Sequence, residues 1–132
     1  MQIKAGLSRV QDLDIERLTS EATSAGFKVF VLKPGIDTRE SFFESIREAI
    51  PLDPPIVGTQ SWDALSDSLW GGLYSVDQDR ILIVWPKSTA MAAMSQEDHQ
   101  IAIDVLNDVV TSLADRESTQ ERPKSVTVLL GS

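Results

Sequence analysis

Three side chains on one short predicted helix have the types and the spacing to bind a cationic surface. The pattern of residues 62–70 predicts a helix, and at about 100° per residue Asp63, Asp67 and Trp70 fall within about 60° of one another. Two like charges four residues apart destabilise an isolated helix by roughly 0.3 kcal/mol. Large aromatic side chains beside charge that complements a partner's are typical of the energetic centres of protein interfaces. We therefore interpret this face as a partner-binding surface; the alternative for Trp70 is a ring folded back over Gly71-Gly72 to cover the edge of the core.

The chain around this helix is strongly acidic. Its 132 residues include 20 acidic and 12 basic side chains, a net charge of −8. Residues 48–79 contain six of the acids and not one lysine or arginine. This balance argues against direct binding to nucleic acid, because no cluster of cations would release phosphate counterions, and it favours a basic protein as partner. The alternative is a solvated loop region that happens to lack bases.

Signals for catalysis or metal binding are weak. His99 is the only histidine, it lies beside acids at the start of a predicted helix, and the chain has no cysteine. It therefore has neither a metal-ligand set nor a nucleophile to activate. Gly71-Gly72 follows a helix instead of preceding one, so it does not form a phosphate-binding loop. We expect no catalytic residue, no cofactor and no metal, and interpret His99 as an exposed residue; an enzyme using His99 and nearby acids is the weakest hypothesis.

The predicted elements alternate between helices and apolar strands. Residues 27–32, 80–85 and 126–130 predict strands that are apolar throughout, which is typical of a parallel sheet buried on both faces. Helices are expected before, between and after the first two strands. We therefore predict an α/β fold with a small three-stranded parallel sheet covered by helices.

Local signals set the expected helix boundaries. Asp37 followed by Glu40 three residues later resembles a capping box, and so does Ser95 followed by Asp98. Ser61 is the expected N-cap of the 62–70 helix, which is predicted to stop at the two glycines. We divide the chain into an N-terminal helical extension, residues 1–26, consisting of a leader and a helix, and a main domain, residues 27–132.

Targeting signals are absent from the sequence. No apolar run has the length of a signal-peptide core or of a membrane span, which requires roughly 20 residues. Without cysteine no disulfide can form. We expect a cytoplasmic protein with no membrane partner.

The residues that carry these signals resemble the barstar family of ribonuclease inhibitors. The matching stretch is Trp62-Asp63-Ala64-Leu65-Ser66-Asp67-Ser68-Leu69, followed by an apolar strand that ends at Trp85 and a chain that closes with Val128-Leu129-Leu130-Gly131. The resemblance covers about residues 27–132. It implies a barstar-like fold, no enzymatic activity and a bacterial immunity protein that is monomeric when free.

The resemblance also implies a mechanism, in which the short helix and the loop before it plug the active site of a small basic barnase-like ribonuclease. Asp67 would occupy the place of a substrate phosphate, and Asp63 would pair with an arginine at the rim. The implied partner-binding residues are Asp63, Asp67, Trp70, Ser66, Gly58 and Thr59. A further acid near the end of the long helix is expected to join them, with Asp115 and Glu117 as candidates.

A second hypothesis is a barstar-fold interaction or regulatory module without a nuclease target. It is motivated by the loop Ile56-Val57-Gly58, where the family usually has an aromatic residue before the glycine, and by Ser61, where it usually has asparagine.

Overall fold

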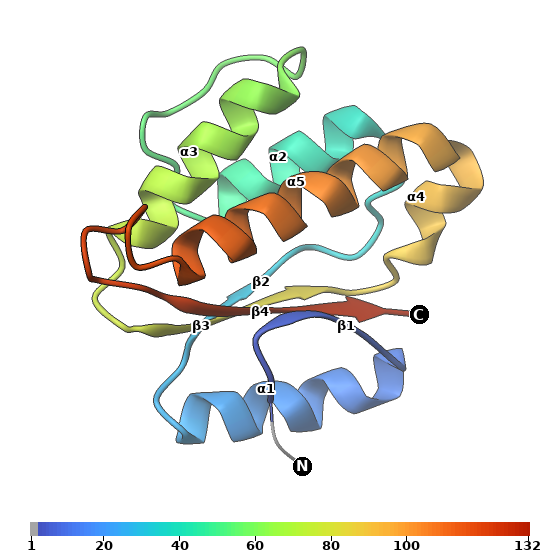
Figure 1. Ribbon diagram of the computed structural model, residues 1–132. Coiled ribbons are helices and arrows are strands. Elements are labelled where there is room, and N and C mark those ends of the chain that lie inside the picture. Colours follow the sequence, from blue (N-terminus) through green and yellow to red (C-terminus); the bar gives the residue numbers. More distant parts are fainter. Residues whose placement is uncertain (1–2) are drawn as a thin grey trace.

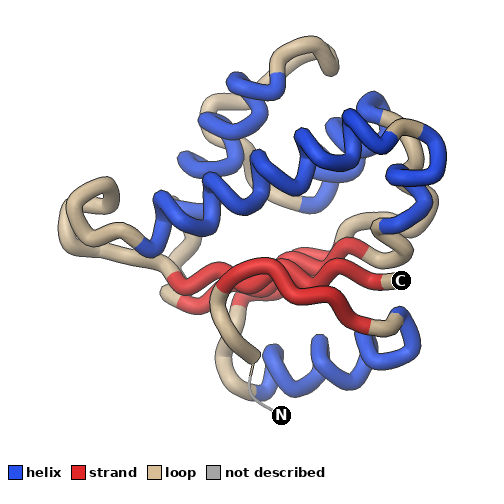
Figure 2. Tube along the Cα trace, turned by 45° about the vertical axis from the view of Figure 1, so that its right-hand side comes forward, coloured by secondary structure: helices blue, strands red, loops and turns tan. Residues whose placement is uncertain are grey.

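The computed structural model describes residues 3–132 and has an α/β fold built on a four-stranded, all-parallel sheet. The strand order is β1-β4-β3-β2. Helix α1 lies on one face of the sheet, and α2, α3, α4 and α5 lie on the other (Figures 1 and 2). The strands are β1 (Gly6–Val10), β2 (Lys28–Val31), β3 (Arg80–Trp85) and β4 (Ser125–Gly131). The helices are α1 (Ile15–Ser24), α2 (Arg39–Ala49), α3 (Trp62–Tyr74), α4 (Thr89–Met94) and α5 (Gln96–Ala114), with a 3₁₀ turn at Asp12–Asp14.

The prediction of three strands is wrong by one, because β1 was read as part of a leader. Strand β1 pairs with β4 along its whole length, from Gly6 opposite Thr127 to Val10 opposite Gly131. It is an edge strand, so only part of its surface is buried and its sequence includes Ser8 and Arg9. The helix predicted in the extension is confirmed as α1. Residues 1 and 2 of the extension lie outside the described residues.

The inner strands match the expectation of apolar runs buried on both faces. On β3, Ile81, Ile83 and Trp85 pack into the core under α2 to α5, whereas Leu82 and Val84 pack with Leu18 of α1 on the opposite face. The faces alternate because successive side chains of a strand point to opposite sides. The sheet thus fixes the two helical layers relative to each other.

The helix caps agree with the sequence at two sites and differ at one. The Ser61 and Ser95 hydroxyls accept hydrogen bonds from the backbone N–H groups of Ala64 (3.0 Å) and Asp98 (3.2 Å), as expected for N-caps. Helix α2 is capped by Thr38 rather than by Asp37. The partner in its capping box is Ser41, whose N–H donates to the Thr38 hydroxyl at 3.0 Å.

Helix α3 does not stop at the two glycines, as predicted, but continues through them to Tyr74. The glycines serve close packing instead of termination. A Cβ added at Gly71 would lie 2.1 Å from the carbonyl oxygen of Asp53, and one at Gly72 would lie 1.6 Å from that of Pro51. Only glycine admits the backbone of residues 51–53 so close to the helix. The connection between α2 and α3 is thereby fastened to α3, where Asp53 N–H also donates to the Ser68 carbonyl at 3.1 Å.

Helix α4, between β3 and α5, was not predicted. No helix within residues 3–132 is long and apolar enough to cross a lipid bilayer. The same residues contain no group of three or more histidine, aspartate or glutamate side chains arranged to hold a metal ion.

Candidate partner-binding face

Asp63 and Asp67 both lie on the exposed side of α3. Leu65 and Leu69 on the opposite side are completely buried and therefore fix the rotation of the helix. Within residues 3–132, no hydrogen bond or ion pair involves either carboxylate. Asp63 lies in the first helical turn, where the helix dipole favours a negative charge, but Asp67 lies beyond that turn. Both carboxylates are thus available to a partner.

Trp70 is half-buried and not the free aromatic side chain that we predicted. Its indole N–H donates to the Ser112 hydroxyl of α5 at 3.0 Å, and its ring stacks on Tyr74 with centroids 4.8 Å apart. The ring covers the junction of α3 and α5, which agrees with the alternative that it closes the edge of the core. Trp62 is also half-buried, and its ring packs on Phe43 of α2 with a centroid distance of 5.0 Å.

A hollow between α3 and α5 brings Asp67 together with an acid that sequence reasoning missed, Asp108. Asp108 is exposed and directly precedes the buried Val109 of α5. The sequence places Asp108 next to the apolar residues that form the buried side of α5. It does not show which edge of that buried side faces α3, so the proximity of Asp108 to Asp67 could not be predicted. The hollow is lined by Ser66, Asp67, Trp70, Asp108, Val109, Ser112 and Ser118.

Neither acid proposed near the end of the long helix lines this hollow. Asp115 accepts hydrogen bonds from the hydroxyl and the backbone N–H of Ser118, at 2.7 and 2.8 Å. These hydrogen bonds lower the pKa of Asp115 because they stabilise the carboxylate. Asp115 therefore orders its own turn, and Glu117 follows it in the exposed connection to β4.

The loop before α3 is held by a cation from α2. Arg47 donates to the carbonyl oxygens of Ile56 and Gly58, both at 3.1 Å. Gly58 is exposed and has a φ of +82°, a conformation that favours glycine, whereas Thr59 is half-buried. Val57 stands between the two residues whose carbonyl groups Arg47 binds, and it is 99% exposed. The loop is thus ordered through its backbone and presents one aliphatic side chain.

Lysines neutralise the ends of the acidic segment but not its middle. Lys33 pairs with Glu48 at one end. Lys124, which is only 4% exposed, donates to the carbonyl oxygens of Val76 and Gln78 and lies 4.0 Å from Asp79 at the other end. The carboxylates of Asp63 and Asp67, between these two ends, are paired with neither lysine.

His99 is half-buried, contrary to the prediction of an exposed side chain. Its ring packs near that of Trp85, with centroids 5.7 Å apart. Burial lowers the pKa of His99, and the charge of Arg9 lowers it further. His99 lies on α5 near the carboxyl ends of the strands, away from the residues that line the α3–α5 hollow.

A comparison with protein-family models gives a match over residues 27–130 to the family described as Barstar (barnase inhibitor). The matched range begins after α1 and contains the loop before α3, α3 itself and α5. No curated protein and no solved structure matches the chain.

Proposed function

Because the chain belongs to the barstar family, we propose that it inhibits a small, basic, barnase-like ribonuclease by covering the active-site cleft with α3 and the loop before it. The observation that carries this proposal is the pair of exposed carboxylates on α3, Asp63 and Asp67, which have no internal partner among residues 3–132. Carboxylates without a partner attract a cationic cleft and accelerate association with it.

Asp67 is the proposed substitute for a phosphate of the RNA. Asp108 lines the same hollow, so a cationic side chain of the nuclease that enters there meets two carboxylates. Arginine suits such a place because its planar guanidinium donates to carboxylates in pairs. Asp63, one turn earlier on α3, reaches a cation nearer the rim of the cleft. Ser66, which stands between Asp63 and Asp67 in the sequence, adds a small polar contact.

The loop supplies the apolar part of the proposed interface. Val57 is almost completely exposed at its tip, and Gly58 and Thr59 follow it. Arg47 holds the backbone of this loop in place before the partner binds, which reduces the ordering cost of association. Trp70 acts as a brace between α3 and α5 that keeps Asp67 and Asp108 side by side.

The biological setting belongs to the same proposal. An inhibitor of this kind would protect a bacterial cell as an immunity protein, acting in the cytoplasm as a monomer until it meets the nuclease. A reducing compartment suits a chain without cysteine.

One observation favours the second candidate function, an interaction module without a nuclease target. None of the large apolar side chains that are exposed within residues 3–132 is aromatic, and Trp70 is turned toward Ser112. Interfaces ordinarily use exposed aromatic anchors. Co-purification of a basic nuclease from the source organism would reject the second candidate.

The test is titration of a barnase-like ribonuclease with the wild type and three alanine variants. Asp67→Ala should weaken inhibition about 30-fold or more, the effect of a residue at an energetic centre of an interface. Asp108→Ala should weaken it less, because Asp108 assists in the same hollow. Asp104→Ala is the matched control: it is another exposed acid of α5, bound to Gln100, and should inhibit like the wild type.

Folding of these variants can be checked by circular dichroism, since replacing an exposed helical aspartate with alanine costs little stability. If Asp67→Ala inhibited as strongly as the wild type, the proposed function would be wrong.

A further inference from the structure

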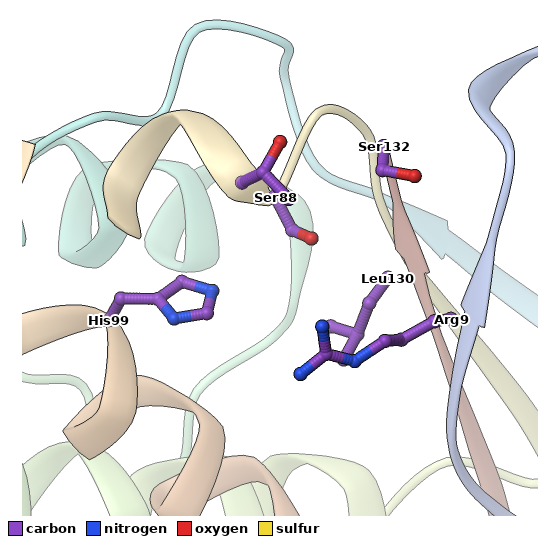
Figure 3. Close-up of a pocket in the computed structure, with 6 residues that line it drawn as sticks. Arg9, Ser88, His99, Leu130 and Ser132 are labelled. Atoms are coloured by element: carbon purple, nitrogen blue, oxygen red, sulfur yellow. The ribbon is translucent and has the colours of Figure 1, made fainter. Parts of the chain in front are cut away.

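A second place of interest lies at the carboxyl ends of the strands, in a recess lined by residues from β1, β4, the β3–α4 connection and α5 (Figure 3). The chain leaves β1 toward α1 on one face of the sheet, and it leaves β3 toward α4 and α5 on the other face (Figure 1). Strand β4 lies between these two diverging connections. In parallel α/β sheets, ligands bind in the crevice at the carboxyl ends of the strands where the connections diverge.

Two basic side chains reach into this recess from opposite sides. Arg9 extends from the edge strand β1, and His99 extends toward it from α5 (Figure 3). The recess has a volume of about 70 Å³, which is enough for a single small group. Its lining residues are Arg9, Ser88, Thr89, His99, Leu130 and Ser132.

Neither basic group has an acidic partner. Within residues 3–132, no carboxylate oxygen lies within 4.0 Å of a nitrogen of Arg9 or His99. By contrast, Arg17 and Arg116 each pair with a glutamate. What distinguishes Arg9 from the other arginines without a carboxylate partner is that the only histidine of the sequence faces it across the recess.

The polar groups of the recess are mostly donors. The Ser88 hydroxyl is occupied, because it donates to the Gly131 carbonyl at 3.0 Å. The Arg9 guanidinium, an imidazole N–H of His99 and the exposed Thr89 hydroxyl have no hydrogen-bond partner within residues 3–132, which leaves them free to donate. A guanidinium, an imidazole and a hydroxyl together suit an oxyanion, whose oxygens accept several hydrogen bonds.

We propose that this recess binds a phosphate-sized oxyanion, either free or as the terminal group of a small metabolite. Arg9 donates through the fork of its guanidinium, and His99 closes the opposite side. Arg9 and Ser132 both lie outside the residues matched to the family, 27–130, so the site depends on parts of this chain that the family match does not include. It is separate from the acidic face of α3 and independent of the proposed inhibition.

His99 allows a direct test because it is the only histidine and gives a single set of imidazole signals. Inorganic phosphate is titrated into the full chain at constant ionic strength, and the His99 ring is followed by nuclear magnetic resonance. We expect a saturable change, and we expect the pKa of His99 to rise in saturating phosphate because the anion stabilises the imidazolium. Arg9, across the recess, is the charged group that faces His99, and the neighbouring Trp85 ring is neutral.

Variants of Arg9 identify the second arm of the site. Arg9→Gln should weaken phosphate binding about tenfold or more, and Arg9→Lys should weaken it less because the charge remains while the fork is lost. Arg17→Gln, at an exposed arginine of α1, is the matched control and should bind like the wild type. Thermal melting checks that each variant is folded.

Acetate, titrated in a parallel arm, distinguishes the two kinds of oxyanion. Saturation by phosphate alone supports a phosphate ligand, and saturation by both supports a site that also accepts carboxylates. A change in the His99 signals that does not saturate, or that saturates equally in Arg9→Gln, would overturn the proposal.

Discussion

Two regions of the molecule carry charged side chains without an ion-pair partner among residues 3–132, and these two regions differ in sign and in shape. On α3, Asp63 and Asp67 are exposed carboxylates on the outer side of a helix. At the carboxyl ends of the strands, Arg9 and His99 face each other across a recess of about 70 Å³. A projecting pair of acids can enter the cleft of another protein, whereas a recessed pair of bases admits only a small anion. Shape, together with sign, is thus the reason why we propose different classes of partner for the two regions.

The two regions also differ in how the fold positions them. The acidic face depends on close backbone packing, because Gly71 and Gly72 admit residues 51–53 against α3. The basic recess depends on an edge strand, because Arg9 belongs to β1, which is paired on one side only. Each region can therefore be changed without altering the other.

The largest effect is expected from reversing the charge in each region. Asp67→Lys should weaken inhibition of a barnase-like ribonuclease about 1,000-fold, since like charges at an interface cost several kcal/mol. Arg9→Glu should leave inhibition unchanged and should abolish the binding of phosphate. Inhibition of the ribonuclease and the response of the His99 resonance to phosphate are measured for both variants.

Both variants change an exposed side chain, so both should remain folded. The comparison fails if Arg9→Glu also weakens inhibition strongly, because the two regions would then form one functional surface.

A smaller effect, about 3 kcal/mol of unfolding free energy, is expected from Gly72→Ala. The new Cβ would lie 1.6 Å from the Pro51 carbonyl oxygen, and backbone atoms cannot move aside as a flexible side chain can. Urea denaturation measures the loss, and Asn107→Ala, at an exposed position of α5, is the control. Where the variant is still folded, we expect weaker inhibition, because the loop moves relative to α3, and unchanged binding of phosphate. A variant as stable as the wild type would contradict the close packing of residues 51–53 against α3.

Most of the fold could be predicted from the sequence because the inner strands are buried on both faces. Such strands are continuous apolar runs, as in the stretch from Ile81 to Trp85. Strand β1 was missed for the converse reason: at the edge of the sheet, Ser8 and Arg9 are tolerated, and the apolar pattern is broken. The length of α3 was missed because Gly72 is required by its close contact with the Pro51 carbonyl group, and Pro51 is distant in sequence.

The candidate site, too, has features that the sequence predicts and features that it does not. The exposure of Asp63 and Asp67 follows from the periodicity of a single helix, with Leu65 and Leu69 on its buried side, and was predicted correctly. Contacts between helices have no such local signal. The turn of Trp70 toward α5 and the presence of Asp108 beside Asp67 both required the packing of α3 on α5.

The smallest effect concerns pH and the basic recess. Burial and the charge of Arg9 lower the pKa of His99 below 6.5, so the folded state binds its proton less readily than the unfolded state does. The contribution of His99 to stability is therefore fully present above about pH 6.5 and is lost as the pH falls through the lower pKa of the folded state. Urea denaturation between pH 8 and pH 5 should show a slightly larger loss of stability for the wild type than for His99→Gln. Saturating phosphate should reduce that difference, because an anion bound between Arg9 and His99 favours the protonated ring. If the two proteins lost stability in parallel, with or without phosphate, then neither burial nor the charge of Arg9 would lower the pKa of His99, and no anion would be bound beside its ring.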